Sequence, residues 1–159
     1  FPVWMNPERY DLFEESLEKG FSKAGGGKSL ADFEIAPFCT VIMGDDLEKC
    51  RMPVKHSMAL YIGGMGARGK NFYNDYAKRL GYEEAAVKIQ DLYLDGKKGE
   101  AAAAVPDQLI DDVALVGSAD RIRDRLQAWN AAGAKRHVGS LLAGTNDPAA
   151  LRVLAEEVL

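Results

Sequence analysis

The stretch from residue 113 to residue 142 constrains the fold of this chain more than any other part of its sequence. Ser118 follows an apolar tetrad, and its hydroxyl can accept a backbone N–H bond in the first turn of a helix. Apolar side chains then recur at the spacing i, i+4, i+7, which predicts one buried stripe on that helix. The stripe consists of Ile122, Leu126 and Trp129.

The end of this helix leads to a predicted strand. Gly133 is expected to end the helix at the usual left-handed position, and residues 138–142 form a short apolar run typical of a buried strand. A capped helix that delivers the chain to a buried strand is half of a βα repeat, and such repeats build parallel sheets and barrels. The sequence therefore predicts an α/β fold.

The strongest strand signal lies at residues 33–43, which are almost continuously apolar, as in a strand buried on both faces of a parallel sheet. Gly44 is expected to end this strand. Asp45 is expected to cap the next helix and to form a capping box with Glu48. A shorter apolar run at residues 1–5 stops at Asn6-Pro7, which predicts another strand followed by a helix.

Residues 63–112 do not follow the alternation of strand and helix. This segment opens with a glycine-rich turn and continues with helix-prone sequence, including a predicted helix at residues 82–95 and an alanine run at residues 101–104. We interpret residues 63–112 as a helical insertion within one domain that spans residues 1–159.

Two stretches resemble the luciferase-like monooxygenase superfamily, and more closely its branch that uses a 5-deazaflavin coenzyme of the F420 type. One is V-A-L-V-G-S-A-D-R-I-R-D-R-L at residues 113–126, followed by A-A-G-A at 131–134; the other is Y-I-G-G-M-G-A-R-G-K-N-F-Y-N at 61–74. The branch usually has Pro and Glu where this chain has Ala119 and Asp120.

The resemblance implies the C-terminal part of a (β/α)8 TIM barrel. It makes the strands near residues 1, 38 and 139 the sixth, seventh and eighth, with the helical insertion after the seventh strand and above the barrel mouth. The tetrad at residues 113–116 is then a lead-in to the helix; counted as a strand, it would instead give half a barrel. Because the sequence starts with Phe-Pro-Val-Trp and not with Met, we expect a fragment or a processed chain.

The resemblance also implies a deazaflavin coenzyme in the barrel mouth, hydride chemistry on a small organic substrate, and a homodimer. The alternative enzyme is an FMN-dependent monooxygenase of the same superfamily. Six residues are candidates for coenzyme binding. Arg68 and Lys70 are cations in a glycine-rich turn suited to an acidic tail or an anionic substrate. Gly63 and Gly64 provide either close approach to a ligand or turn geometry. Trp4 either lines the pocket or packs in the core, as the sequence leaves open.

Ser118, the sixth candidate, is either a phosphate ligand at a helix N-terminus or a plain helix cap. No catalytic residue can be assigned, and no metal site is expected, because His56 and His137 lack partners at a metal-binding spacing. A non-catalytic alternative is a barrel fragment, or a flavin-storing relative such as the non-fluorescent flavoproteins of this superfamily.

Charge and composition limit the partners. The 159 residues carry a net charge of −4, which argues against a nucleic-acid surface because phosphate backbones require clustered excess cations. The sequence has no run of about 20 apolar residues, so no membrane span is expected. Cys39 and Cys50 are too few for a disulfide framework, which fits a reducing cytoplasm.

Overall fold

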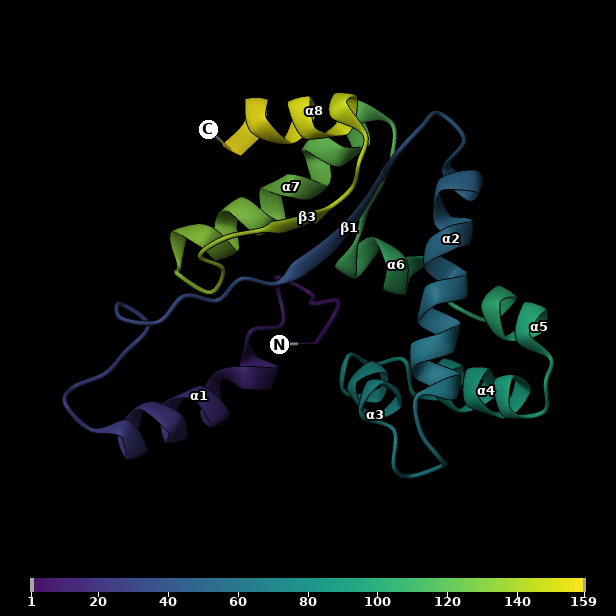
Figure 1. Cartoon of the computed structure of the whole chain (residues 1–159), viewed down its shortest axis with the longest axis horizontal. Coiled ribbons are helices and arrows are strands. Elements are labelled where there is room, and N and C mark those ends of the chain that lie inside the picture. Colours follow the sequence, from purple (N-terminus) through teal and green to yellow (C-terminus); the bar gives the residue numbers. More distant parts are fainter. Residues whose placement is uncertain (1, 159) are drawn as a thin grey trace.

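The computed structural model describes residues 2–158, and these residues form one small parallel sheet with helices around it (Figure 1). Strand β1 (Phe38–Met43) lies in the middle, and β2 (Leu115–Gly117) and β3 (Leu142–Gly144) pair with its two edges. Both pairings are parallel: Val41 is opposite Leu115, and Phe38 is opposite Leu142. The parallel α/β architecture expected from the sequence is therefore present.

Side chains alternate between the two faces of β1. Cys39 and Val41 are buried in a core with α7 (Ala119–Ala134) and α8 (Pro148–Val158), which cover one face of the sheet in Figure 1. This sheet core also contains Leu115, Leu126 and Trp129. On the opposite face Phe38 is 40% exposed, so the strand is not buried on both faces as its continuous apolar sequence suggested.

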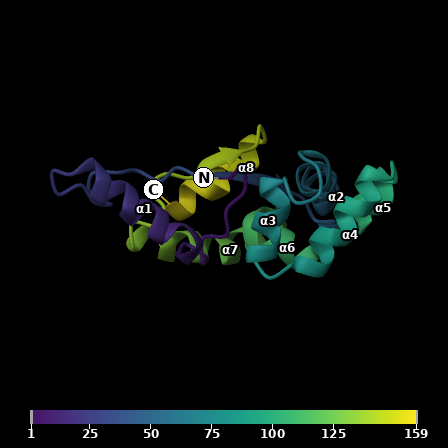
Figure 2. The same cartoon turned by 90° about the horizontal axis from the view of Figure 1, so that it is seen from below.

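A second core joins the helices that follow β1. It is built between α2 (Leu47–Ala59), α3 (Phe72–Arg79), α4 (Glu83–Leu94), α5 (Lys98–Ala103) and α6 (Asp107–Val113), with the π-helix η1 (Leu60–Gly64) continuing α2. We call it the helical core. Residues 63–112 contain no strand among the described residues, and Figure 2 shows these helices gathered at one end of an elongated molecule, with α1 (Asp11–Ala24) at the other.

Two strand predictions are wrong in detail. Residues 2–5 form no strand, while Phe1 lies outside the described residues. Both edges of β1 are occupied by other strands, and Trp4 and Met5 of the apolar run are buried without pairing, at 6% and 0% exposed. The tetrad at residues 113–116, interpreted as a lead-in, contributes to a true strand, since β2 pairs with β1 over Leu115–Gly117.

Other boundaries shift because backbone hydrogen bonds decide them. The strand predicted at residues 33–43 begins only at Phe38, after Pro37, which has no N–H to donate. The strand predicted at 138–142 pairs instead over Leu142–Gly144. Helix α1 begins at Asp11, four residues after Pro7, because residues 6–10 form turns first.

Two helix ends also differ from expectation. Asp46, and not Asp45, caps α2 by accepting a hydrogen bond from the Lys49 backbone N–H at 3.1 Å. Helix α7 continues through Gly133 to Ala134, and the left-handed residue beyond it is Arg136, at φ 59°. The sequence identified both helices, but it placed the cap residue of α2 and the last residue of α7 one position too early.

Candidate functional site

The exposed face of β1 forms one wall of a hollow of about 380 Å³. Helix α2 forms the opposite wall, and Trp4 and residues 113–114 close the hollow from the sides. Among the described residues that line it, none carries a charge; the polar groups are the hydroxyls of Thr40, Ser57 and Tyr61 and the indole of Trp4. A mostly apolar hollow with a few polar groups is typical of a small-molecule site.

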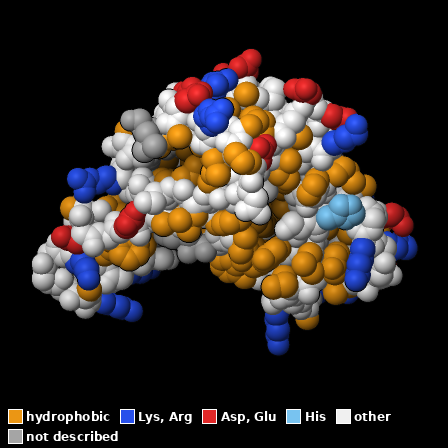
Figure 3. Space-filling view, turned by 45° about the horizontal axis from the view of Figure 1, so that its top comes forward, with side chains coloured by type: hydrophobic (Ala, Val, Ile, Leu, Met, Phe, Trp, Pro, Cys, Tyr) orange, Lys and Arg blue, Asp and Glu red, His pale blue; other side chains and the backbone are white. Residues whose placement is uncertain are grey.

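A second hollow, of about 650 Å³, adjoins the first at the carboxyl ends of β1 and β3. The two hollows share Phe38, Ile42 and Gly144. The polar rim of the second comes from Thr145 to Asp147, which lead into α8. Figure 3 shows hydrophobic side chains gathered around a hollowed region of the surface. In parallel α/β folds, ligands bind at this end of the strands.

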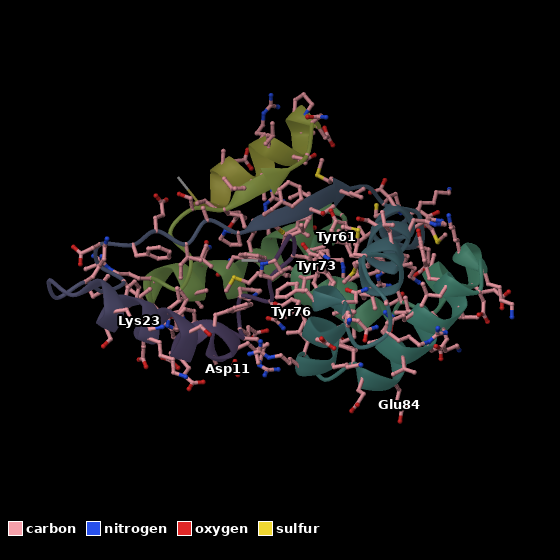
Figure 4. The ribbon with its side chains drawn as sticks, turned by 60° about the horizontal axis from the view of Figure 1, so that its bottom comes forward. Asp11, Lys23, Tyr61, Tyr73, Tyr76 and Glu84 are labelled. Carbon is pink, nitrogen blue, oxygen red and sulfur yellow. The ribbon has the colours of Figure 1, made fainter. Side chains whose placement is uncertain are left out.

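An aromatic cluster lies behind the first hollow. The ring centroid of Trp4 is 5.7 Å from that of Tyr73 and 5.2 Å from that of Tyr76, and Tyr61 meets Tyr73 edge-on at 4.6 Å. Figure 4 shows Tyr61, Tyr73 and Tyr76 following one another through the middle of the molecule. Burial raises the pKa of Tyr76 to about 12, so this phenol stays protonated at neutral pH.

A charged cluster fixes α2 against α6 and α7. The Asp111 carboxylate lies 2.7 Å from the guanidinium of Arg51 on α2 and 2.7 Å from that of Arg121 on α7. Asp107 accepts from Arg51 at 3.0 Å and from Lys55 at 2.6 Å. Since α2 carries Ser57 and leads directly to Tyr61, this cluster fixes one wall of the hollow.

Of the six candidate residues from the sequence, only Trp4 lines the hollow. Its indole nitrogen is buried and has no hydrogen-bond partner within the described chain. Arg68 pairs with Asp91 at 2.8 Å on the surface, where both side chains are more than half exposed. Lys70 is exposed in the same loop. The structure therefore does not bring these two cations together with Trp4.

Gly63 and Gly64 have a packing explanation. A Cβ on Gly64 would lie 2.5 Å from the Tyr93 ring, and one on Gly63 would overlap the Cβ of the same tyrosine. The absence of side chains lets η1 pack directly on α4. This is a third use of glycine, beside the turn geometry and the ligand approach that the sequence left open.

Ser118 is placed as a helix cap. Its hydroxyl accepts a hydrogen bond from the backbone N–H of Arg121 at 3.3 Å, at the start of α7. The side chain is outside both hollows on the exposed face of β1. Its role toward a phosphate stays a prediction.

Sequence reasoning did not select Thr40, Ser57 or Tyr61 as candidate binding residues. Thr40 carries the one hydroxyl in the otherwise apolar strand β1. This break in the apolar pattern could have marked Thr40 as a candidate in the sequence. Ser57 and Tyr61 lie four residues apart, the spacing that puts two side chains on one side of a helix. Only the packing of α2 beside β1 shows that this side faces a hollow.

Comparison with known families settles the relationship. The sequence profile described as "Luciferase-like monooxygenase" matches residues 1–136. The chain belongs to this family. The resemblance carried by residues 61–74 and 113–134 is thereby confirmed.

Two relatives of this luciferase-like chain have names that refer to coenzyme F420 or to methanopterin. A protein of Mycobacterium tuberculosis named a coenzyme F420-dependent oxidoreductase is 37% identical over 132 residues, which cover 83% of this chain and 38% of the relative. The 5,10-methylenetetrahydromethanopterin reductase of Archaeoglobus fulgidus is 21% identical over 159 residues, or 97% of this chain and 45% of the relative. The chain thus spans less than half the length of either relative.

A solved structure agrees on the fold. The coenzyme F420-dependent tetrahydromethanopterin reductase from Methanopyrus kandleri superposes with a TM-score of 0.67 and 21% sequence identity, covering 98% of this luciferase-like chain and 42% of the reductase. The α/β fold of the chain therefore matches that of an F420-dependent reductase. None of the helices described here is long and apolar enough to cross a membrane.

Proposed function

We propose that this chain is the C-terminal part of a (β/α)8 barrel, about strands six to eight, in an oxidoreductase that uses a deazaflavin coenzyme of the F420 type. Residues 63–112 are then the helical insertion over the barrel mouth. The family membership and the F420-related names of the relatives support this proposal. Strand β2 follows this insertion and belongs to the sheet, since it pairs in parallel with β1.

The observation that carries the proposal is the uncharged lining of the hollow beside β1. A flat, uncharged ring suits such a lining, since apolar and aromatic walls bury its faces while a few hydroxyls meet its polar edge. An acidic tail does not suit it, because a charge buried without a partner is costly. The ring therefore belongs in the hollow, and the tail belongs outside it.

The chain offers separate groups for the two parts of the coenzyme. Thr40, Ser57 and Tyr61 can exchange hydrogen bonds with the ring, and Trp4 supports it from the side. Arg68 and Lys70 are exposed cations for the acidic tail, reached beyond the end of α2. When bound, a deazaflavin supplies a two-electron hydride donor or acceptor to a small organic substrate. FMN is the alternative coenzyme, and a flavin-storing protein without turnover is the alternative function.

Titration with deazaflavin and with FMN tests the coenzyme, using the protein in the length its gene produces. We expect saturable deazaflavin binding that Thr40→Val weakens roughly 3- to 10-fold, the loss of one hydrogen bond. Thr40→Ser, which keeps the hydroxyl, is the matched control. Tighter binding of FMN than of deazaflavin would favour FMN as the coenzyme. Tight coenzyme binding without any catalytic turnover would favour the flavin-storing function.

The cations are tested separately. Changing Arg68 and Lys70 together to Gln is expected to weaken coenzyme binding and to reduce its dependence on salt, because exposed ionic contacts are screened. An unchanged affinity would reject the role proposed for these two residues but not the hollow. Sedimentation of the same protein tests the homodimer that the family implies.

A further inference from the structure

The backbone that carries Tyr61 departs from the α-helix that precedes it. After Ala59 the chain continues as the π-helix η1, and the carbonyl oxygens of Tyr61 and Ile62 accept hydrogen bonds from side chains outside the helix. A π-turn is rare and widens the helix, so it needs partners for the groups it displaces. Those partners determine where the Tyr61 side chain lies.

Asn71 provides most of these bonds. Its side-chain nitrogen donates to the Tyr61 carbonyl at 3.0 Å and to the Ile62 carbonyl at 2.9 Å. Its side-chain oxygen accepts from the backbone N–H groups of Tyr73 at 3.0 Å and Asn74 at 3.2 Å, which caps α3. Asn71 is 1% exposed. A side-chain amide can donate and accept in this way, whereas a carboxylate can only accept.

Neighbouring groups fix η1 from two further sides. The side-chain nitrogen of Asn74 donates to the Ile62 carbonyl at 3.2 Å and to the Ala86 carbonyl of α4 at 2.8 Å, and this asparagine is 2% exposed. The glycines at the end of η1 lie directly against Tyr93. The stretch that resembles the family, residues 61–74, is therefore one hydrogen-bonded unit that holds a π-turn in place.

The side chain held by this unit faces the hollow. Tyr61 lines the hollow, and its ring rests edge-on against Tyr73 (Figure 4). Within residues 2–158 its hydroxyl makes no hydrogen bond, although its carbonyl does. A rigidly mounted ring with a free hydroxyl at the wall of a hollow is suited to bind a ligand, because little conformational freedom is lost on binding.

We propose that the Tyr61 hydroxyl is a hydrogen-bonding group for the ligand of the hollow, and that Asn71 is the positioning residue that sets it there. This inference rests on the proposed function for the identity of the ligand, a deazaflavin ring. It adds a role for the π-turn and for a buried asparagine that touches no ligand itself.

A double-mutant cycle tests the contact. Deazaflavin affinity is measured by titration for the unchanged protein, Tyr61→Phe, Asn71→Asp and the double variant, with thermal unfolding recorded for each. Tyr61→Phe is expected to weaken binding roughly 3- to 10-fold, as for one lost hydrogen bond, with little change in the unfolding temperature. Asn71→Asp keeps the cap of α3 but loses both bonds to η1, so it should weaken binding and lower the unfolding temperature.

The decisive result is the affinity of the double variant. If Asn71 acts through the Tyr61 hydroxyl, the double variant binds deazaflavin no more weakly than the single variant with the lower affinity. Its unfolding temperature remains lowered, as in Asn71→Asp alone. Additive losses of affinity would overturn the positioning role, and unchanged affinity in Tyr61→Phe would overturn the contact. Asn71→Ser, which keeps a capping oxygen, replaces Asn71→Asp if that variant does not fold. Asn130→Asp adds the same charge at an exposed position of α7 and serves as a control.

A second measurement needs no ligand. In protein labelled with 3-fluorotyrosine, the fluorine resonance missing from Tyr61→Phe identifies Tyr61. This resonance should move in Asn71→Asp and stay in place in Asn130→Asp; an unmoved resonance in folded Asn71→Asp would reject the positioning role. If the unchanged protein binds neither deazaflavin nor FMN, the proposed function and the contact both fail, and the fluorine resonance still decides the positioning.

Discussion

The sheet core and the helical core are stabilised by different means. The sheet core between β1, α7 and α8 is mainly apolar, with Cys39 0%, Val41 2% and Leu126 0% exposed. The helical core contains comparable apolar side chains but also two buried asparagines, Asn71 and Asn74, that hold the π-turn. A charged cluster around Asp111 joins the two sides.

This difference follows from what each region supports. Apolar packing needs only volume and periodicity, so it tolerates many arrangements with similar energy. Buried hydrogen bonds and ion pairs are directional, and an unpaired member is costly. The walls of the hollow are positioned by the directional groups, while the sheet core provides the stable support behind β1.

The largest effect is expected from a cavity in the sheet core. Leu126→Ala should lower the free energy of unfolding by about 2–5 kcal/mol, because a fully buried leucine is removed. Leu142→Ala, the same change at a side chain that is 50% exposed, should stay within about 0.5 kcal/mol. Denaturant unfolding measures both. Similar losses in the two variants would show that the sheet core is not the main apolar support.

A smaller loss is expected at the junction of the two cores. Asp111→Asn should lower the free energy of unfolding by about 3 kcal/mol, near the lower end of the cost of removing one partner of a buried ion pair. The reason is that Arg51 and Arg121 would then face each other without the carboxylate between them. Asp124→Asn, at an exposed position of α7, is the control. A loss no greater than the control's would mean that apolar contacts alone join the cores.

The cap of α7 tests how much the sheet side depends on hydrogen bonds. Ser118→Ala should cost about 1 kcal/mol of stability, since the Arg121 N–H loses its partner. Ser118→Asn, which can also cap, should recover most of this loss. If Ser118→Ala weakens coenzyme binding without loss of stability, the residue is a phosphate ligand and not only a cap.

The smallest effect is an acid dependence of the charged cluster. The hydrogen bond from Lys55 lowers the pKa of Asp107 below its ordinary value of 3.8, so its carboxylate stabilises the fold above that pH. This contribution should disappear as the pH falls from about 3.8 through the lowered pKa. In this pH range the free energy of unfolding should therefore change less steeply with pH for Asp107→Asn than for the unchanged protein. An identical slope would show that this pair adds nothing to acid stability.

Sequence alone identified the family and the parallel α/β class. It also located helix α7 with its cap and its buried stripe, because a cap, a periodic stripe and an apolar strand are local patterns that survive without knowledge of neighbours. Ser118, Ile122 and Leu126 all occupy the places that this pattern gave them. The sequence could not decide whether residues 113–116 belong to a strand, since pairing depends on the free edge of β1.

The tertiary structure alone decided the candidate site. Arg68 stood out in the sequence as a cation in a glycine-rich turn, yet it pairs with Asp91 on the surface. Thr40, Ser57 and Tyr61 come from segments up to 21 positions apart, and only the packing of α2 and η1 beside β1 brings them to one hollow. Periodicity indicates which side chains are buried, whereas the side of a hollow that a helix forms depends on contacts between separate elements, here those of Asn71 and Asp111.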